Sequence, residues 1–179
     1  MRVSVTAAIK SKALVQVQCR VEGPNEIDGF VLAVSDEWLL VRDVASLQPK
    51  GYYLLRRDTV HFIQSTVYLK FKQRVLRKEH LLKSSLQHPG IDLSDIAAIL
   101  SWLQKERRFA ILWRATKDEW WSRHSLVCGV TPKNVLLRLF DGAGRWENQT
   151  FRWTLNKITA IRFDSHHLRM FEKYAAKTN

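Results

Sequence analysis

Basic side chains spaced along residues 65–86 are the strongest candidates for chemistry in this sequence. Lys70, Arg74 and Arg77 follow one another at intervals of four and three residues, and Lys78 lies beside them. This spacing places three cations on one face if the segment is a helix. A cationic stripe neutralises phosphates in a salt-dependent way that does not read base sequence. We therefore predict a surface that binds nucleic acid or another polyanion.

The apolar residues of the same segment fit either a strand or a helix. Val67, Leu69 and Phe71 alternate with polar residues as in a strand, whereas Tyr68, Phe71 and Val75 fall on one helical face. The internal repeat described below favours the helix. We predict that this helix packs through Tyr68, Phe71 and Val75, and the alternative to a binding surface is that the basic stripe is its solvated outer face.

A second basic site is predicted at Arg56 and Arg57, which follow Tyr52 and Tyr53 closely. Cations interleaved with aromatic rings hold single-stranded nucleic acid by charge and stacking. Strand alternation sends the two arginines to opposite faces, so one of them joins any given surface. The alternative is that a tyrosine packs in the core and an arginine is solvated.

Two adjacent tryptophans, Trp120 and Trp121, are predicted to lie in a polar loop with Arg123 nearby. Tryptophan and arginine concentrate binding energy at protein interfaces. These three residues are therefore candidates for a protein–protein contact. The alternative is that one ring packs over the end of the fold.

No arrangement of residues typical of catalysis is found. The sequence contains no glycine-rich phosphate loop, nucleophile elbow or HExxH motif, and its six histidines have no metal-site spacing with cysteine or carboxylate. Cys19 and Cys128 are more than a hundred residues apart and lie in apolar runs, which predicts buried free thiols. We expect a binding protein that has no catalytic residues, no cofactor and no metal.

The composition is that of a globular protein with a strong positive charge. The chain has 179 residues, 46% of them apolar, and a formal net charge of +12, which favours anionic partners such as RNA or an acidic protein surface. Lys10 and Lys12 interrupt any signal-like segment at the N-terminus, and no apolar run approaches the ~20 residues of a membrane-spanning helix. We expect a cytoplasmic protein with no membrane partner.

Short segments with period-two alternation predict the main secondary structure. Five predicted strands occupy residues 14–21, 29–34, 38–43, 51–56 and 60–64. A further short strand is predicted over Val3–Thr6.

The same pattern returns about a hundred residues later. Residues 109–115 match 15–21 at an offset of 94, the next two strands match at 96, and the last two match at 99. The offset of 99 continues past the last predicted strand. We therefore predict a helix over residues 165–177 and a corresponding helix after residue 65. The break at His88-Pro89-Gly90 predicts two domains, 1–88 and 89–179, the second led by a helix that starts near Asp92 or Ser94.

The repeated unit resembles the Sm-like small β-barrel family. Gly29-Phe-Val-Leu-Ala-Val followed by Trp38-Leu-Leu-Val is similar to its first motif, and Leu55-Arg56-Arg57-Asp58 is similar to its second. The resemblance implies a strongly bent five-stranded barrel, RNA binding and assembly through edge strands. Leu39 stands where the family has its base-reading asparagine, and Arg57 where it has glycine. Leu155 and Asn156 depart from the second motif in the later copy.

Together these patterns predict a mainly β protein with helices (α+β), built from two tandem five-stranded Sm-like or SH3-like barrels, each followed by a helix. The predicted function is non-enzymatic binding of RNA or another polyanion through a basic surface. The alternative is a protein-interaction or assembly module that uses the tryptophan loop and the barrel edge strands, by which copies of the chain would associate.

Overall fold

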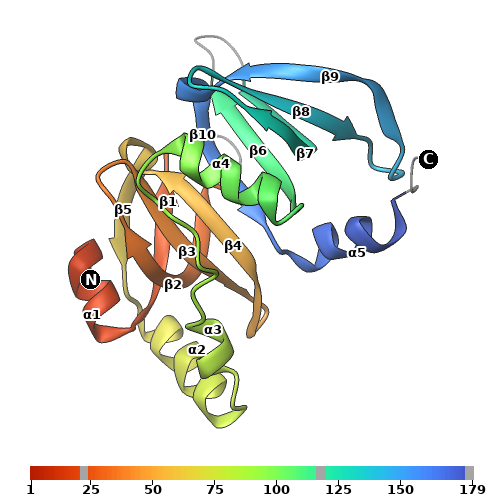
Figure 1. Cartoon of the computed structure of the whole chain (residues 1–179). Coiled ribbons are helices and arrows are strands. Elements are labelled where there is room, and N and C mark those ends of the chain that lie inside the picture. The colour runs from red at the N-terminus through yellow and green to blue at the C-terminus, as the bar shows by residue number, and fades with distance from the viewer. Residues whose placement is uncertain (21–23, 116–119, 176–179) are drawn as a thin grey trace. The chain divides into compact units, whose positions relative to one another are not determined.

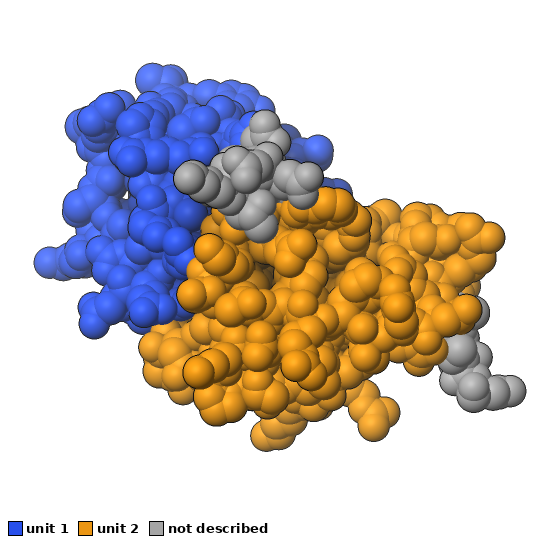
Figure 2. All heavy atoms as spheres, turned by 90° about the horizontal axis from the view of Figure 1, so that it is seen from above, with its two compact units in different colours: residues 1–90 blue, residues 91–179 orange. Residues whose placement is uncertain are grey.

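The computed structural model describes residues 1–20, 24–115 and 120–175. The chain divides into two compact units, Met1–Gly90 and Ile91–Asn179, coloured separately in Figure 2. The predicted boundary, between residues 88 and 89, lies two residues before this division. Each unit is described by itself.

Unit 1 begins and ends with helices that flank five strands (Figure 1). The side chain of Ser4 accepts a hydrogen bond from the Ala7 N–H and so caps the first helix, which starts at Val5. The elements are α1 (Val5–Ser11), β1 (Leu14–Cys19), β2 (Glu26–Val34), β3 (Trp38–Ala45), β4 (Gln48–Arg56), the 3₁₀ turn η1 (Arg57–Thr59), β5 (Val60–Gln64), α2 (Val67–Lys78) and α3 (Leu82–Ser85).

The five strands of unit 1 form an antiparallel sheet in the order β5-β1-β2-β3-β4. Gly29 is required in this sheet, because a Cβ atom there would lie 2.4 Å from the carbonyl oxygen of Arg42 on β3. One apolar cluster joins the sheet to α2 through buried Leu69 and Leu76; its strand members are Leu14, Phe30 and Val44. The helix therefore covers apolar surface of the sheet.

The face that α2 buries differs from the predicted one. Leu69, Lys72 and Leu76 are buried, whereas Tyr68 and Phe71 are exposed. The prediction that α2 packs through Tyr68 and Phe71 is wrong, whereas Val75, the third predicted packing residue, is half-buried. The apolar residues of α2 occupy a broad side of the helix, and contact with the sheet selected the part of that side that carries the two leucines.

Unit 2 repeats this plan. Its leading helix is capped by Asp95, whose side chain accepts from the Ala98 N–H, one residue beyond the predicted cap at Ser94. The elements are α4 (Ile96–Lys105), β6 (Phe109–Ala115), β7 (Trp120–Val130), β8 (Asn134–Phe140), β9 (Trp146–Thr154), η2 (Leu155–Lys157), β10 (Ile158–Phe163) and α5 (His166–Tyr174). The antiparallel order is β10-β6-β7-β8-β9.

Irregular features recur at the predicted offset of 96. A β-bulge lies between Val31 and Ala33 of β2, and another lies between Val127 and Gly129 of β7. The following turns also agree: Ser35 Oγ accepts from the Trp38 N–H at 3.0 Å, as Thr131 Oγ1 does from the Asn134 N–H. Bulges and turn bonds are not explained by apolar alternation, so their recurrence shows that the two units share one backbone plan.

The helices that directly follow the fifth strand of each unit, α2 and α5, also correspond, at an offset of 99; we call them the closing helices. The side chains of Thr66 and Ser165 cap α2 and α5 by accepting from the N–H groups three residues ahead. Gln73 Oε1 accepts from the Leu14 N–H and Glu172 Oε1 from the Phe109 N–H, both at 3.0 Å. Each closing helix thus binds the first residue of its unit's first strand.

The prediction of two closed barrels is wrong. In each unit the strand order is open: among the described strands, β4 does not pair with β5, nor β9 with β10. Alternation identifies strands that have an apolar face, but it does not determine whether the first and last strands meet. Here helices cover apolar surface instead, and the fold is mainly β with some helices.

Two local predictions are also wrong. Residues 5 and 6 of the predicted strand Val3–Thr6 belong to α1, which the Ser4 cap initiates. Trp120 and Trp121 open strand β7 and pair with Ala115 and Arg114, so they do not lie in a loop.

Candidate polyanion-binding surface

The outward face of α2 carries four cationic side chains. Lys70, Arg74, Arg77 and Lys78 are all exposed, and α2 contains no acidic residue from Val67 to Lys78. No described acidic side chain forms an ion pair with any of the four. Their positive charge is therefore available to an anion from outside the protein. We call these four residues the α2 cationic face.

Several other described cations form ion pairs within the protein. Lys72, on the buried side of α2, places its Nζ 2.7 Å from Asp28 Oδ2 and also donates to the Val44 carbonyl at 3.2 Å. Arg145 pairs with Asp141 at 2.8 Å and Arg169 with Asp164 at 3.1 Å. Lys72 therefore does not join the α2 cationic face, although it lies in the same stretch of sequence.

Three apolar side chains share the solvent side of α2 with these cations. Val67 is 83% exposed, Tyr68 is 63% exposed and Phe71 is 49% exposed. Large apolar side chains that cluster in the open commonly mark a contact surface. Sequence reasoning missed this feature because it assigned Tyr68 and Phe71 to the packed side of the helix.

Arg56 and Arg57 are used within unit 1. The guanidinium of Arg56 forms a two-pronged hydrogen bond with the Asp58 carboxylate, at 2.8 and 2.7 Å. This bond lowers the pKa of Asp58 and raises that of Arg56. Arg57 donates to the carbonyl oxygens of Ser35 and Asp36. The two arginines therefore stabilise neighbouring turns.

The tyrosines that precede these arginines do not form a stacking surface. Tyr52 and Tyr53 are both buried. The Tyr52 hydroxyl donates to the Gln87 carbonyl at 3.0 Å, and the Arg42 guanidinium lies 4.2 Å from the centre of its ring. Bases have no access to these rings in this structure.

Trp121 is half-buried between two arginines. The guanidinium carbon of Arg123 lies 4.7 Å from its ring centre and that of Arg114 lies 5.9 Å away. Arg114 also stacks on buried Trp153 at 4.9 Å. Cation–π contacts of this kind stabilise unit 2. They also cover part of the Trp121 ring, which the sequence predicted as a candidate for a protein interface.

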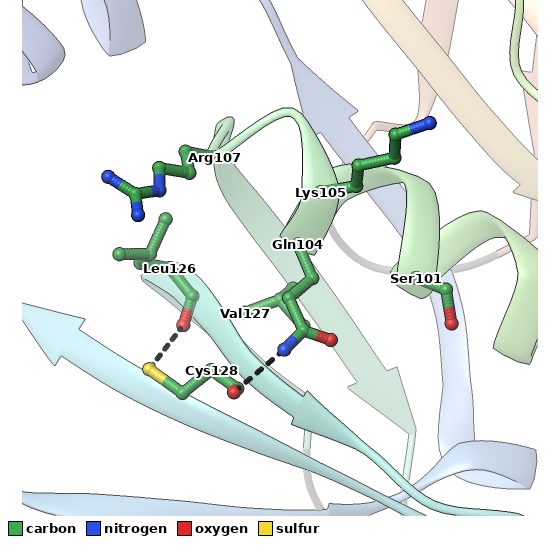
Figure 3. Close-up of a pocket in the computed structure, with 7 residues that line it drawn as sticks. All are labelled: Ser101, Gln104, Lys105, Arg107, Leu126, Val127 and Cys128. Carbon is green, nitrogen blue, oxygen red and sulfur yellow. Dashed lines mark hydrogen bonds between the residues drawn. The ribbon is translucent and has the colours of Figure 1, made fainter.

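An open pocket of about 590 Å³ lies between α4 and β7 (Figure 3). Gln104 Nε2 donates to the carbonyl of Cys128 at 2.9 Å, and Cys128 Sγ lies 3.6 Å from the Leu126 carbonyl oxygen. Lys105 and Arg107 line the pocket but point in different directions, so they do not converge on one anion. Cys128 is exposed here, contrary to the prediction of two buried thiols.

The cysteines are both free. Burial raises the pKa of the Cys19 thiol to about 12, which keeps it protonated and unreactive. Sequence reasoning did not find the exposure of Cys128 because this residue occupies the bulge of β7, where apolar alternation is interrupted.

Two histidines meet in unit 2. His124 Nε2 and His167 Nε2 are 3.2 Å apart, and both rings contact Phe171. Burial and the nearby His167 lower the pKa of His124. Within residues 1–20, 24–115 and 120–175, no three histidine, cysteine or acidic side chains are grouped as a metal site requires.

Within the described ranges, no helix is both long enough and apolar enough to span a membrane.

In comparisons with known proteins, no family model, no curated protein and no solved structure matches this sequence.

Proposed function

We propose that this protein binds nucleic acid, RNA in particular, through the α2 cationic face. The observation that carries this proposal is that four exposed cations stand on one helix with no acidic partner among the described residues. The formal net charge of +12 adds a long-range attraction for anions.

Binding of this kind is governed by the release of counterions from phosphates. If all four cations of the face contact a single strand, the logarithm of the association constant falls with the logarithm of salt concentration at a slope of about −3. Affinity then decreases by about 50-fold between 50 and 200 mM salt. The proposal thus predicts both the presence of binding and its salt dependence.

The direct test reverses three charges of the face. The variant Lys70→Glu, Arg74→Glu, Arg77→Glu is compared with Lys133→Glu, Lys157→Glu, Lys173→Glu, whose targets are exposed in unit 2. Both variants lower the formal net charge by the same amount. Fluorescence anisotropy with a labelled mixed-sequence RNA across a salt series should show strong loss in the first variant and modest loss in the second.

Two results would reject the proposal. One is the absence of any RNA binding by the native protein at low salt. The other is an equal loss of affinity in both triple variants, because the effect would then come from net charge and not from α2.

A second candidate function, self-assembly through an edge strand, rests on β9. This strand has nine residues and, among the described strands, one hydrogen-bonded neighbour, β8. By contrast, the outer edge of β5 is covered by the N-terminal residues, since the Val3 N–H donates to the Ile63 carbonyl and the Ser65 N–H to that of Met1. An uncovered edge pairs readily with another strand. Sedimentation velocity at increasing concentration tests this function, and a monomer throughout would exclude it.

A further inference from the structure

The apolar side chains on the outside of α2 have no role in charge neutralisation. Tyr68 and Phe71 lie three residues apart, so their rings leave the same side of the helix about 4.5 Å apart along its axis. Both rings are largely exposed, and the core beneath them is formed by Leu69 and Leu76 instead. Lys72 Nζ lies 5.4 Å from the centre of the Tyr68 ring, on one side of it. The exposed parts of both rings can contact a ligand without unfolding the unit.

The cations adjoin these rings. Val67, Phe71, Arg74 and Lys78 follow one line along the helix, at i, i+4, i+7 and i+11, and Lys70 lies on one flank. An exposed ring beside unpaired cations offers a nucleobase a stacking surface and its phosphate a charge. That combination is typical of proteins that hold single strands.

The corresponding helix of unit 2 differs at the positions of Tyr68 and Phe71. At the offset of 99, Tyr68 corresponds to His167 and Phe71 to Met170. His167 is engaged with His124 and Phe171, and Met170 has no aromatic ring. Its cation Arg169 is paired with Asp164. α5 carries one exposed ring, Tyr174, with Lys173 Nζ 5.0 Å from its centre. α2 carries two exposed rings and four cations that form no ion pair with a described acidic residue.

We infer that α2 selects single-stranded over double-stranded nucleic acid, with Tyr68 and Phe71 stacking against unpaired bases while the α2 cationic face binds the phosphates. This inference rests on the proposed function. In a duplex the bases are already stacked on one another and their faces are unavailable to the two rings. A membrane surface fits less well, because two cations, Arg74 and Lys78, occupy half of the central line of the face, where a membrane-lying helix has apolar residues.

The experiment distinguishes binding to the bases from binding to the phosphates. The probes are a labelled 12-nucleotide oligouridylate, an abasic strand of the same length, which keeps the phosphates and lacks the bases, and a 12-base-pair RNA duplex. The native protein should bind the oligouridylate more tightly than either of the other two. Tyr68→Ala and Phe71→Ala should each weaken oligouridylate binding by about tenfold and leave abasic binding unchanged.

Conservative and matched variants keep the test independent of folding. Phe71→Tyr retains a ring and should retain affinity, whereas Phe71→Leu retains apolar volume without a π-face and should lose as much as Phe71→Ala. Met170→Ala, at the position on α5 that corresponds to Phe71, should bind all three probes like the native protein. Unchanged abasic binding shows in each case that α2 is folded.

The remaining outcomes all count against the inference. Stacking is refuted if Phe71→Leu binds oligouridylate like the native protein. It is also refuted if the alanine variants lose as much affinity for the abasic strand as for oligouridylate. In both cases charge-based binding stands. If no probe binds at low salt, the proposed function fails and the inference fails with it. If the alanine variants lose binding only to phosphatidylserine-containing vesicles, the face is a membrane contact and not a nucleic-acid surface.

Discussion

The two units of this protein place different chemistry at equivalent positions of one backbone plan. In unit 1, buried Lys72 of α2 forms an ion pair with partly exposed Asp28 of β2. In unit 2, the corresponding residues are Phe171 of α5 and His124 of β7, and their rings are 5.7 Å apart. An ion pair in one unit is therefore replaced by an aromatic contact in the other.

This difference extends to the surfaces of the two closing helices. Phe171 belongs to an aromatic cluster with Phe109, Phe140 and Trp146 that anchors α5 in unit 2. In unit 1 the ion pair and two leucines hold α2, and its aromatic residues are left on the outside. The scaffold thus tolerates either interior, and the proposed binding surface lies where the aromatic residues are not needed for packing.

The largest effect is expected in the aromatic cluster. Phe140 is buried, and its ring centre lies 4.9 Å from that of Phe171 and 5.0 Å from that of Phe109. Phe140→Ala should lower the free energy of unfolding by about 3–5 kcal/mol, because it leaves a cavity. The corresponding change in unit 1, Val44→Ala, should cost less since it removes fewer atoms. Chemical denaturation measures both, and equal costs would contradict the difference between the two interiors.

The ion pair of unit 1 should be the next most sensitive feature. Asp28→Ala leaves the Lys72 ammonium buried without its carboxylate, and we expect a loss of about 3 kcal/mol in the free energy of unfolding. The double variant Asp28→Ala, Lys72→Met removes the stranded charge and should recover most of that loss. A double variant as unstable as the single one would show that the pair does more than neutralise a buried charge.

The two helix caps should be equal in effect. Thr66→Ala and Ser165→Ala each remove one side-chain bond to a helix N–H, at 3.2 Å in both units. Each should lower the free energy of unfolding by about 1 kcal/mol. Hydrogen exchange at the first turns of α2 and α5 checks the result locally, and a cap that matters in one unit alone would break the correspondence of the closing helices.

The smallest expected effect is a pH dependence confined to unit 2. The pKa of His124 is lowered in the folded state from its ordinary value of 6.5, so the unfolded chain binds the proton more tightly. The stabilisation is complete above pH 6.5 and is lost as the pH falls through the folded pKa. His124→Gln should flatten this part of the stability curve, measured by denaturation from pH 8 to pH 5. If His124→Gln leaves the stability curve unchanged, His124 is not the source of the pH dependence.

Much of the fold was predictable because its signals are local. Alternating residues such as Val15, Val17 and Cys19 indicated the strands, and the break at Pro89-Gly90 indicated the division into units. The offsets of 96 and 99 identified the correspondence that the bulges and caps display. The four cations of α2 were also identified as neighbours, since helical spacing alone brings them together.

What was missed depends on contacts distant in sequence. Lys72 lies in the same stretch of sequence as the exposed cations, and nothing near it indicates that Asp28, 44 residues earlier, is its partner.

The sequence by itself determined the strands, the repeat and the presence of a basic helix, because periodicity and charge are properties of neighbouring residues. Only the tertiary structure decided that the sheets are open, that Lys72 is buried and that Tyr68 and Phe71 face solvent. The physical reason is that the apolar side of α2 is broader than the surface that the helix buries, and packing against β1 and its neighbours selected which of these residues to bury.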